Sequence, residues 1–299
     1  MLGLNYPWLN YGHDFGQAAW PGGLWSHDGM SNFESTSVVD QDFAMLKSKG
    51  AHVIRVFVFA DGRASPEFDS QGNITGFDRF FFDDFDTILS LASLHDLYVI
   101  PVLLDFYWLD YPRRVGGVQL GGHADAITNT SKRQTFLDNA LRPLLERYGN
   151  EYRIVAWEVI NEPEWTSKGI PGGGTVGPTV TIAEMQAFVQ DVINYTHRYA
   201  SQPITIGSAK GQWLTYWLGL GLDFYQFHYY DSNELAPPFV PYSDLGLDKP
   251  AILGEFPTGS TAITVTHYLS ATWENGYAGA LAWSLNGDDR FSNFITPGT

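Results

Sequence analysis

Strand-like runs alternate with helical patterns along most of the chain, and this alternation limits the possible folds more than any other feature. Eight short runs rich in β-branched, aromatic or aliphatic residues are expected to be strands, at residues 3–8, 52–59, 97–104, 157–161, 203–207, 224–230, 250–256 and 278–285. Alternation of this kind favours a parallel β/α architecture. Eight strands within 299 residues favour a closed (β/α)8 TIM barrel over an open doubly wound sheet.

Helical patterns fill most of the intervals between these strands. Apolar residues at helical spacing and capping signals predict helices at residues 36–49, 78–94, 131–148, 181–193, 212–219 and 264–275. Two of them begin at apparent capping boxes, Ser131 to Gln134 and Thr181 to Glu184. Only 14 residues follow Leu285, so the eighth outer helix is expected to be short or missing. The length suits one barrel, which predicts a single catalytic domain over residues 1–299.

Two glutamates are expected at the ends of strands on opposite sides of this barrel. Pro163 cannot donate to a strand ladder, so the fourth strand should stop at Asn161-Glu162. Glu255 occupies the corresponding end of the seventh strand. The carboxyl ends of barrel strands carry the functional residues of such folds. Two carboxyl groups facing each other across a ligand can perform glycoside hydrolysis, one as acid/base and the other as nucleophile or base.

The surroundings of the two glutamates suggest different roles. Trp157 and Trp165 flank Glu162, and apolar surroundings raise the pKa of a carboxyl group, which suits an acid/base. Glu255 would be anionic, and a nucleophile, if Arg55 and Tyr230 point at it. Arg55 is a charge within an apolar strand, so it should either close a structural ion pair or contact a functional carboxylate.

Several of these residues together resemble the clan A glycoside hydrolases, most closely family 5, which contains cellulases and β-mannanases. The resemblance spans nearly the whole chain and rests on Arg55, Asn161-Glu162-Pro163, His228-Tyr229-Tyr230, Gly254-Glu255-Phe256 and Trp283. It implies a retaining mechanism without a cofactor. It also implies that Asn161 bonds the sugar 2-hydroxyl, that Arg55 and Tyr230 orient the nucleophile, that His228 lines the site and that Trp283 stacks on a sugar.

The substrate remains open between β-1,4-glucan and β-mannan. Many family 5 cellulases carry a histidine at the end of the third strand. This chain has Asp105-Phe106-Tyr107-Trp108 there, which is more similar to the tryptophan-bearing strand ends of mannanases. Trp8, Trp108 and Asp14 are further candidates for sugar binding. For the two tryptophans, and for Trp165 and Trp213, stacking on sugar and packing in the core are equally compatible with the sequence. A loop aspartate such as Asp14 is also often a turn cap.

Charge and composition exclude several other functions. With 17 basic and 33 acidic residues the net charge is −16, which disfavours nucleic acid and anionic membranes as partners. A neutral carbohydrate fits this charge, and we expect a monomer. A metal site is disfavoured, because the sequence has no closely spaced histidines and no cysteine. The N-terminal residues show no signal peptide, which leaves a cytoplasmic and a processed secreted protein both open.

The sequence therefore predicts a hydrolase that cleaves a neutral β-linked polysaccharide or oligosaccharide by double displacement. Aromatic residues spread over several loops favour endo-acting cleavage in an open cleft. An exo-acting glycosidase or transglycosidase of the same clan is an alternative, because the long segments 9–32 and 109–130 could block one end of the cleft. A catalytically inactive carbohydrate-binding barrel would explain the aromatic residues but not the two glutamates.

Overall fold

Eight parallel strands form a closed barrel in the computed structural model, which describes residues 1–17, 27–230 and 240–293. Around the barrel the strand order is β1-β14-β13-β12-β11-β8-β5-β2. The strands are β1 (Leu2–Asn5), β2 (Val53–Phe57), β5 (Tyr98–Asp105), β8 (Trp157–Asn161), β11 (Ile204–Ser208), β12 (Tyr225–His228), β13 (Ala251–Pro257) and β14 (Ala280–Trp283). The predicted TIM barrel is confirmed.

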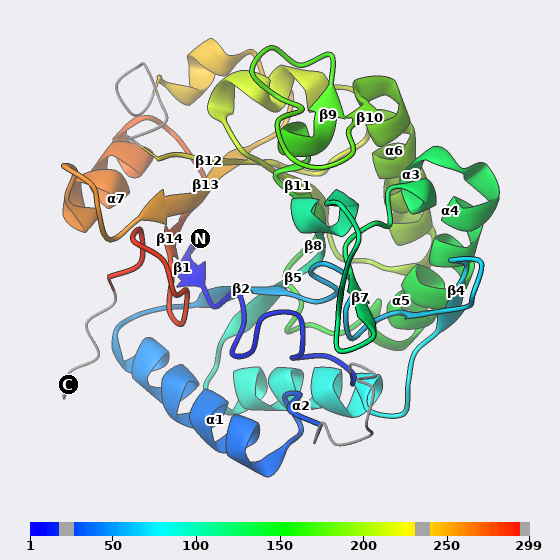
Figure 1. The fold of residues 1–299 in the computed structure, drawn as a ribbon. Coiled ribbons are helices and arrows are strands. Elements are labelled where there is room, and N and C mark those ends of the chain that lie inside the picture. The colour runs from blue at the N-terminus through cyan, green and yellow to red at the C-terminus, as the bar shows by residue number, and fades with distance from the viewer. Residues whose placement is uncertain (18–26, 231–239, 294–299) are drawn as a thin grey trace.

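Helices surround this barrel on its outer face (Figure 1). The α-helices are α1 (Phe33–Ser48), α2 (Phe81–Leu94), α3 (Asp125–Thr128), α4 (Thr130–Phe136), α5 (Arg142–Tyr148), α6 (Ile182–Tyr199) and α7 (Val265–Glu274). A π-helical segment, η2 (Leu137–Leu141), joins α4 to α5. None of the described helices is both long and apolar enough to cross a membrane.

The third barrel strand illustrates how the sequence produces the core. In β5 every residue after Tyr98 is buried, because the strand is covered by side chains in the barrel interior on one face and by helices on the other. Its neighbour β2 is buried along its whole length even though it contains Arg55. The barrel interior therefore contains a full positive charge, which requires anionic partners nearby.

Helix caps were only partly predicted. The capping box at Thr181 is confirmed, because the Thr181 side chain accepts a hydrogen bond from the Glu184 backbone N–H and Glu184 accepts from that of Thr181. The box expected at Ser131 is wrong. The side chain of Asn129 accepts from the backbone N–H groups of Ser131 and Lys132, so Asn129 is the N-cap and α4 begins at Thr130. Asparagine is as good an N-cap as serine, and it lies two residues before the expected cap.

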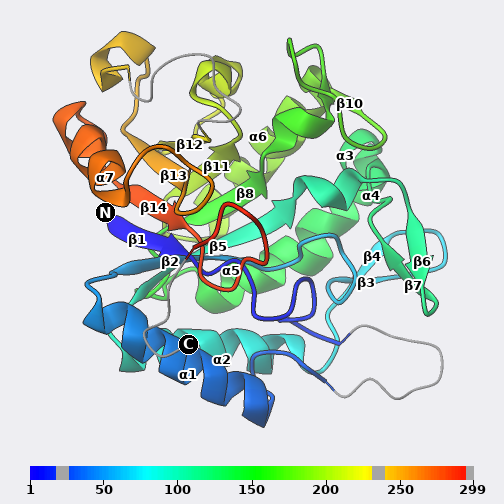
Figure 2. The ribbon, with the colours of Figure 1, turned by 60° about the vertical axis from the view of Figure 1, so that its left-hand side comes forward.

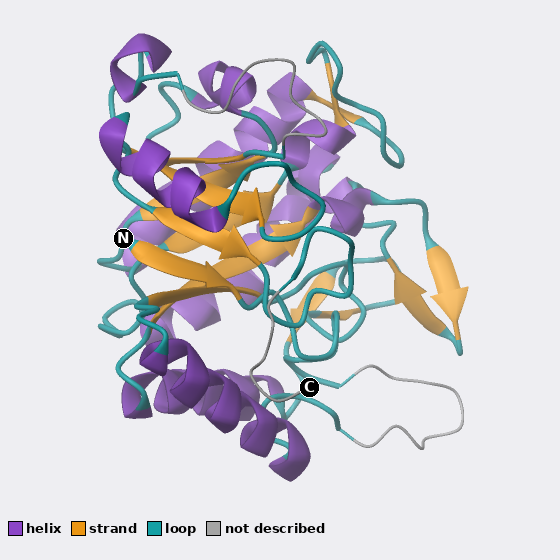
Figure 3. Ribbon diagram, turned by 90° about the vertical axis from the view of Figure 1, so that its left-hand side faces the viewer, coloured by secondary structure: helices purple, strands orange, loops and turns teal. Residues whose placement is uncertain are grey.

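The connections at the carboxyl ends of the strands contain small elements that the sequence patterns did not predict. Figures 2 and 3 show the strands pointing toward the side of the molecule where these loops and hairpins gather. The hairpin elements are β3 (Glu67–Phe68) with β4 (Ile74–Gly76), and β6 (Arg113–Val115) with β7 (Val118–Leu120). The short pair β9 (Ser167–Lys168) and β10 (Val180–Thr181) is parallel. Four 3-10 segments complete the described elements. Three were not predicted, η1 (Phe106–Leu109), η3 (Pro163–Thr166) and η5 (Tyr242–Leu245), whereas η4 (Gly211–Trp217) lies where a helix was expected.

Asp84 joins the long connection after β1 to helix α2. Its buried carboxylate accepts hydrogen bonds from the backbone N–H groups of Gly16 and Ser31 at 2.9 and 2.8 Å, and from the Ser31 hydroxyl at 2.6 Å. The His27 Nε2 atom lies 2.8 Å from the same carboxylate. The Asp84 side chain thus binds both described stretches of this connection, residues 6–17 and 27–32.

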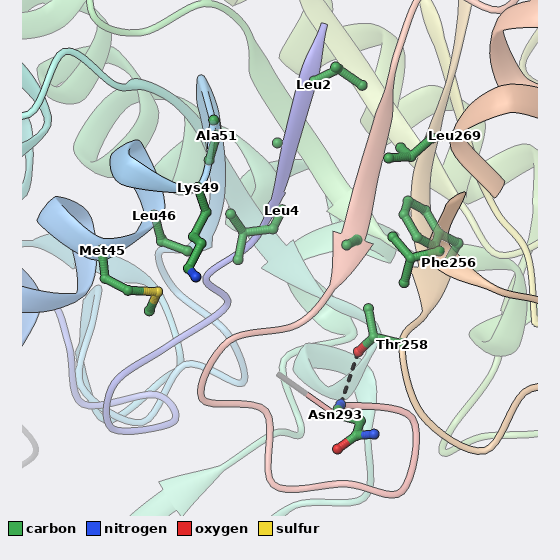
Figure 4. Close-up of a pocket in the computed structure, with 14 residues that line it drawn as sticks. Leu2, Leu4, Met45, Leu46, Lys49, Ala51, Phe256, Thr258, Leu269 and Asn293 are labelled. Carbon is green, nitrogen blue, oxygen red and sulfur yellow. Dashed lines mark hydrogen bonds between the residues drawn. The ribbon is translucent and has the colours of Figure 1, made fainter. Parts of the chain in front are cut away.

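No helix follows β14 in the described residues, which end at Asn293, as the short C-terminal sequence suggested. An apolar groove of about 520 Å³ lies between α1 and α7. Leu4 of β1 and Phe256 of β13 form its floor, and Met45 and Leu269 approach from the two helices (Figure 4). In a complete (β/α)8 barrel the eighth helix occupies this interval.

Candidate active site

A cleft of about 440 Å³ opens at the carboxyl ends of the barrel strands. All eight strands contribute side chains to it, either from the strand ends themselves or from the segments that follow them. The lining residues are Trp8, Phe57, Asp105, Phe106, Tyr107, Asn161, Glu162, Trp165, Ala209, Lys210, Tyr230, Glu255, Trp283, Asp288, Asp289 and Phe291. Both predicted catalytic glutamates and four of the predicted binding residues (Trp8, Asn161, Tyr230 and Trp283) are therefore in one cleft.

Glu162 lies immediately after β8, as the Pro163 argument predicted. Its Oε2 accepts a hydrogen bond from Trp165 Nε1 at 2.8 Å, and its Oε1 is 2.8 Å from His228 Nδ1. Its backbone has φ 47° and ψ 47°, the left-handed region that costs a residue with a side chain ~1–3 kcal/mol. Burial raises the pKa of the Glu162 carboxyl to about 7, so this group keeps its proton near neutral pH.

Glu255 lies within β13 and has different partners. Its Oε1 accepts from Arg55 Nη1 at 2.6 Å, and its Oε2 accepts from the Tyr230 hydroxyl at 2.7 Å. Burial raises the pKa of the Glu255 carboxyl, whereas His228, Arg55 and the hydrogen bond from Tyr230 act in the opposite direction. Of the two side chains Glu255 is the less exposed, at 4% against 15% for Glu162.

The two carboxyl groups and one imidazole are close together. One oxygen of Glu162, one oxygen of Glu255 and a ring nitrogen of His228 all lie within 4.8 Å of one another. Three such atoms are also a possible set of metal ligands, which the spacing of histidines in the sequence did not suggest. The guanidinium of Arg55, already 2.6 Å from Glu255, would repel a cation placed between these groups.

Arg55 connects four barrel strands beneath the cleft. An arginine side chain has five N–H donors, and each donor of Arg55 has an acceptor. Nε and Nη2 donate to the two oxygens of Glu158 at 2.7 and 2.6 Å. Nη1 donates to Asn5 at 2.8 Å and to Glu255 at 2.6 Å, and Nη2 also donates to Asn161 Oδ1 at 2.8 Å. Both sequence interpretations of Arg55 hold, since it pairs with a structural and with a cleft carboxylate.

The geometry of this cleft agrees with what comparison with known proteins finds. Residues 16–289 match the model of the family described as cellulase (glycosyl hydrolase family 5). The chain belongs to glycosyl hydrolase family 5. It is therefore an O-glycosyl hydrolase, as its sequence predicted.

Relatives of this family 5 enzyme include two curated animal proteins named mannan endo-1,4-beta-mannosidase. The protein from Mytilus edulis is 26% identical over 331 residues, covering 95% of this chain and 83% of its own length. The protein from Cryptopygus antarcticus is 26% identical over 346 residues, covering 98% and 83%. The crystal structure of an endo-1,4-beta-mannanase from Eisenia fetida superimposes with a TM-score of 0.81, at 25% identity, covering 98% of this chain and 87% of that chain.

His228 of the family 5 site is fully buried and lies beneath the cleft, so it does not line it as the resemblance implied. Burial lowers the pKa of His228 to about 4, which keeps the ring neutral at neutral pH. A neutral ring has one N–H, and we assign it to Nδ1 because that nitrogen faces Glu162. Its Nε2 has no hydrogen-bond partner among the described residues.

The aromatic residues divide into cleft and core. Trp8 and Trp283 meet edge to face with ring centroids 6.0 Å apart, and Trp283 Nε1 donates to Asp289 Oδ2 at 2.8 Å. Trp165 lies in η3 after β8, across the barrel from β1 and β14, with its ring 5.2 Å from that of Trp213. Tryptophan side chains on both sides of the barrel mouth suit stacking on successive sugar rings.

Two predicted binding residues are wrong. Trp108 is fully buried, packs against His123 with ring centroids 4.8 Å apart, and does not line the cleft. It belongs to η1, whose turn directs this side chain into the core. Asp14 is buried and caps a turn, because its carboxylate accepts from the backbone N–H groups of Leu9 and Asn10, each at 2.8 Å. Asp14 therefore stabilises the connection after β1 and is not in the cleft.

The two remaining glutamates of the Trp157–Trp165 segment, Glu158 and Glu164, have structural partners. Glu158 lies deeper in β8 and accepts hydrogen bonds from Arg55 and Gln226. Glu164 points away from the cleft and accepts from the Ser208 hydroxyl and Trp217 Nε1, both at 2.6 Å.

Asp105 and Lys210 line the cleft without having been predicted as site residues. The sequence placed Asp105 at the end of the third strand, where β5 does end, but gave it no role. Lys210 Nζ lies 5.8 and 5.3 Å from the ring centroids of Trp165 and Trp213. It follows β11 in a glycine-containing connection with no motif, so no sequence signal distinguishes it from a surface lysine.

Proposed function

We propose that this protein is an endo-acting β-1,4-mannanase that hydrolyses its substrate with retention of configuration, with Glu162 as acid/base and Glu255 as nucleophile. The observation that carries the proposal is the approach of a Glu162 oxygen to a Glu255 oxygen within 4.8 Å. Retaining glycosidases hold their carboxyl groups ~5–5.5 Å apart, whereas inverting enzymes need ~6.5–9.5 Å for an intervening water. The separation supports double displacement.

In the first step Glu255 Oε attacks the anomeric carbon while protonated Glu162 gives its proton to the departing glycosidic oxygen. The C–O bond to the leaving sugar breaks as the bond to Glu255 forms. In the second step Glu162, now a carboxylate, takes a proton from water as that water attacks the anomeric carbon and releases Glu255. Each enzyme group returns to its starting protonation state.

The neighbours of each glutamate suit these roles. Arg55 and Tyr230 both donate to Glu255, at 2.6 and 2.7 Å, which fixes its oxygens and favours the anion that attacks. The pKa of Glu162, raised to about 7 by burial, favours an acid that is still protonated when substrate binds. Trp165 and His228 hold one oxygen of Glu162 each.

Mannan is the substrate that the relatives support. The two curated animal relatives are named mannan endo-1,4-beta-mannosidase, and each alignment covers at least 95% of this chain. Trp8 and Trp283 on one side of the glutamates and Trp165 on the other provide contacts for sugars before and after the cleaved bond. A cleft with contacts on both sides favours cleavage within a chain.

A substrate panel tests this proposal. The purified protein is incubated with β-mannan, barley β-glucan, cellulose, laminarin and xylan, and reducing ends and viscosity are followed together. We expect β-mannan to be cleaved fastest, with viscosity falling well before reducing sugar accumulates. Faster cleavage of barley β-glucan would reject the mannanase assignment, and release of single sugars without a loss of viscosity would reject endo action.

The roles of the glutamates are tested with Glu255→Ala in the same assay. Loss of the nucleophile should lower kcat by a factor on the order of 10⁴. Azide or formate should restore turnover of an aryl β-glycoside and yield a product of inverted configuration, because the small anion attacks in place of Glu255. Glu146→Ala, on the exposed face of α5, removes a carboxylate elsewhere and should keep full activity. Turnover by Glu255→Ala without added anion would overturn the assignment.

A further inference from the structure

A hydrogen-bond donor and an acceptor are paired on the surface of the cleft beside the catalytic glutamates. Asn161 Nδ2 donates to Asp105 Oδ1 at 3.1 Å, and both residues line the cleft. Asp105 ends β5 and Asn161 ends β8, and the two residues are register partners in these adjacent strands. The barrel therefore fixes the pair from two rigid elements.

The orientation of both side chains is fixed by their other partners. Arg55 has only donors, so the atom of Asn161 that it contacts at 2.8 Å is the amide oxygen, and the NH₂ group faces Asp105. Asp105 Oδ1 accepts from the Phe106 backbone N–H at 2.7 Å, and Oδ2 accepts from the Tyr11 hydroxyl at 3.2 Å. The pair is therefore preorganised before any substrate arrives.

A donor beside a carboxylate acceptor is complementary to a hydroxyl group. A hydroxyl can accept one hydrogen bond and donate another. A sugar hydroxyl placed between the two side chains would accept from Asn161 Nδ2 and donate to a carboxyl oxygen of Asp105. Burial raises the pKa of Asp105 to about 7, so this second bond gains the strength of an ionised acceptor as pH rises through about 7.

The position of the pair relative to the nucleophile identifies the hydroxyl. Asn161 Oδ1 and Glu255 Oε1 are bonded to the two terminal nitrogens of the same guanidinium, at 2.8 and 2.6 Å. Under the proposed function, on which this step rests, the anomeric carbon lies against Glu255. The hydroxyl nearest to the anomeric carbon is the one on the adjacent carbon, C2.

We propose that Asp105 is a substrate-binding residue that accepts a hydrogen bond from the 2-hydroxyl of the sugar undergoing cleavage, sharing that hydroxyl with Asn161. Mannose and glucose differ only in configuration at C2. Asp105 therefore contacts the one carbon at which β-mannan and β-1,4-glucan differ, and it contributes to the choice between them. Tyr11 is a positioning residue, because it holds the second oxygen of Asp105.

The test combines a change in the enzyme with a change in the substrate. The substrates are aryl β-mannotrioside and aryl β-cellotrioside, each with a counterpart that lacks the 2-hydroxyl on the sugar bonded to the aryl group. At pH 7, Asp105→Ala should lower kcat/KM on the better full substrate about 10-fold, a value between those of a neutral and a charge-assisted hydrogen bond, because the pKa of Asp105 is about 7. On the 2-deoxy counterpart Asp105→Ala should lower kcat/KM less than about 3-fold, because the hydroxyl that Asp105 would bind is absent.

Two further variants separate recognition from structural damage. Asp105→Asn keeps the shape and an acceptor oxygen but cannot ionise, so its loss of kcat/KM should be smaller than that of Asp105→Ala. It replaces Asp105→Ala in the test if that variant does not fold. Asp110→Asn removes a charge from the same connection outside the cleft and should leave both rates unchanged.

The outcomes distinguish this inference from the proposed function. An equal loss on full and 2-deoxy substrates would overturn the role of Asp105 and leave the mannanase assignment intact. Wild-type protein that cleaves neither full trioside would overturn the proposed function and, with it, this inference. We expect Asp105→Ala and removal of the 2-hydroxyl to lower kcat/KM non-additively. We also expect Asp105→Ala to lower the preference for the mannoside over the glucoside.

Discussion

At the scale of single residues, both glutamates of the cleft lie at or near the carboxyl ends of barrel strands, where the chain itself fixes their position. Pro163 ends a ladder, and a carboxylate just before it must point into the cleft. Trp108 and Asp14 could not be placed in the same way. A tryptophan in a 3-10 turn rotates into the core or the cleft depending on one backbone angle, and an aspartate in a loop serves equally as a cap.

The activity of the enzyme should fall as pH rises through about 7. Burial raises the pKa of Glu162 from 4.5 to about 7, so the proton needed by the leaving oxygen is lost only near neutrality. Lys210 lowers the pKa of Glu162 by its charge. In a pH profile of kcat/KM, Lys210→Ala should therefore move the basic limb to higher pH.

Lys47→Ala is the matched control, because Lys47 lies on α1 and pairs with Asp96 far from the cleft. It should leave the pH profile unchanged. A basic limb that stays in place or moves to lower pH in Lys210→Ala would contradict the electrostatic argument.

At the scale of elements, long periodic helices and apolar strands were predicted well, and short connecting elements were not. Helix α6 has both a capping box and apolar residues at helical spacing, so local and tertiary signals agree. The hairpins β3–β4 and β6–β7 contain strands of two or three residues, too short for any periodicity. Segment η4 was predicted as a helix near residues 212–219 and forms a 3-10 helix at Gly211–Trp217.

The connection between β1 and α1 should depend on Asp84. Asp84→Ala leaves the backbone N–H groups of Gly16 and Ser31 without their buried acceptor, which should lower the free energy of unfolding by ~2–4 kcal/mol. Urea unfolding followed by tryptophan fluorescence measures this loss. Asp83→Ala removes the neighbouring exposed carboxylate of α2 and should change stability by less than ~0.5 kcal/mol. Equal effects of the two substitutions would show that Asp84 is not a structural centre.

At the scale of the whole molecule, the strand count was sufficient to predict the closed barrel, because β/α alternation with eight strands leaves few other arrangements. The pattern also predicted that no full helix would follow β14. The strand count could not predict which loop residues contact distant parts of the chain. Asp84 and Glu164 are tens of residues away from their partners Gly16 and Trp217, and no sequence motif links them. Such contacts exist only after the barrel has formed.

The protein should be more stable at pH 5 than at pH 8. Burial raises the pKa values of Asp14, Asp105, Glu162 and Glu164 to about 7, from ordinary values of 3.8 or 4.5. Between these values the folded state binds more protons than the unfolded state. These four groups make stability fall as pH rises through this window, by about 1.4 kcal/mol per pH unit for each group, and their effect levels off above it. The buried rings of His123 and His228, whose pKa values burial lowers to about 4, act in the opposite direction up to about pH 6.5, but they are fewer than the carboxyls.

Thermal unfolding at several pH values measures this effect. The net charge of −16 acts in the same direction, because repulsion between surface carboxylates also grows with pH. Salt at about 1 M, where the Debye length is ~3 Å, suppresses the surface contribution and leaves that of the buried groups. A Tm that is constant or rises from pH 5 to pH 8 in high salt would contradict the prediction.

The hydrogen bonds of Arg55 also bear on how the protein folds. Its partners Asn5, Glu158, Asn161 and Glu255 come from β1, β8 and β13, and the most distant is 200 residues away along the chain. Until the first and the later strands have met, the guanidinium cannot have all these acceptors. Contacts this distant in sequence form late, because loop closure costs entropy before they contribute. The arrangement of the cleft glutamates therefore depends on closure of the ring of strands.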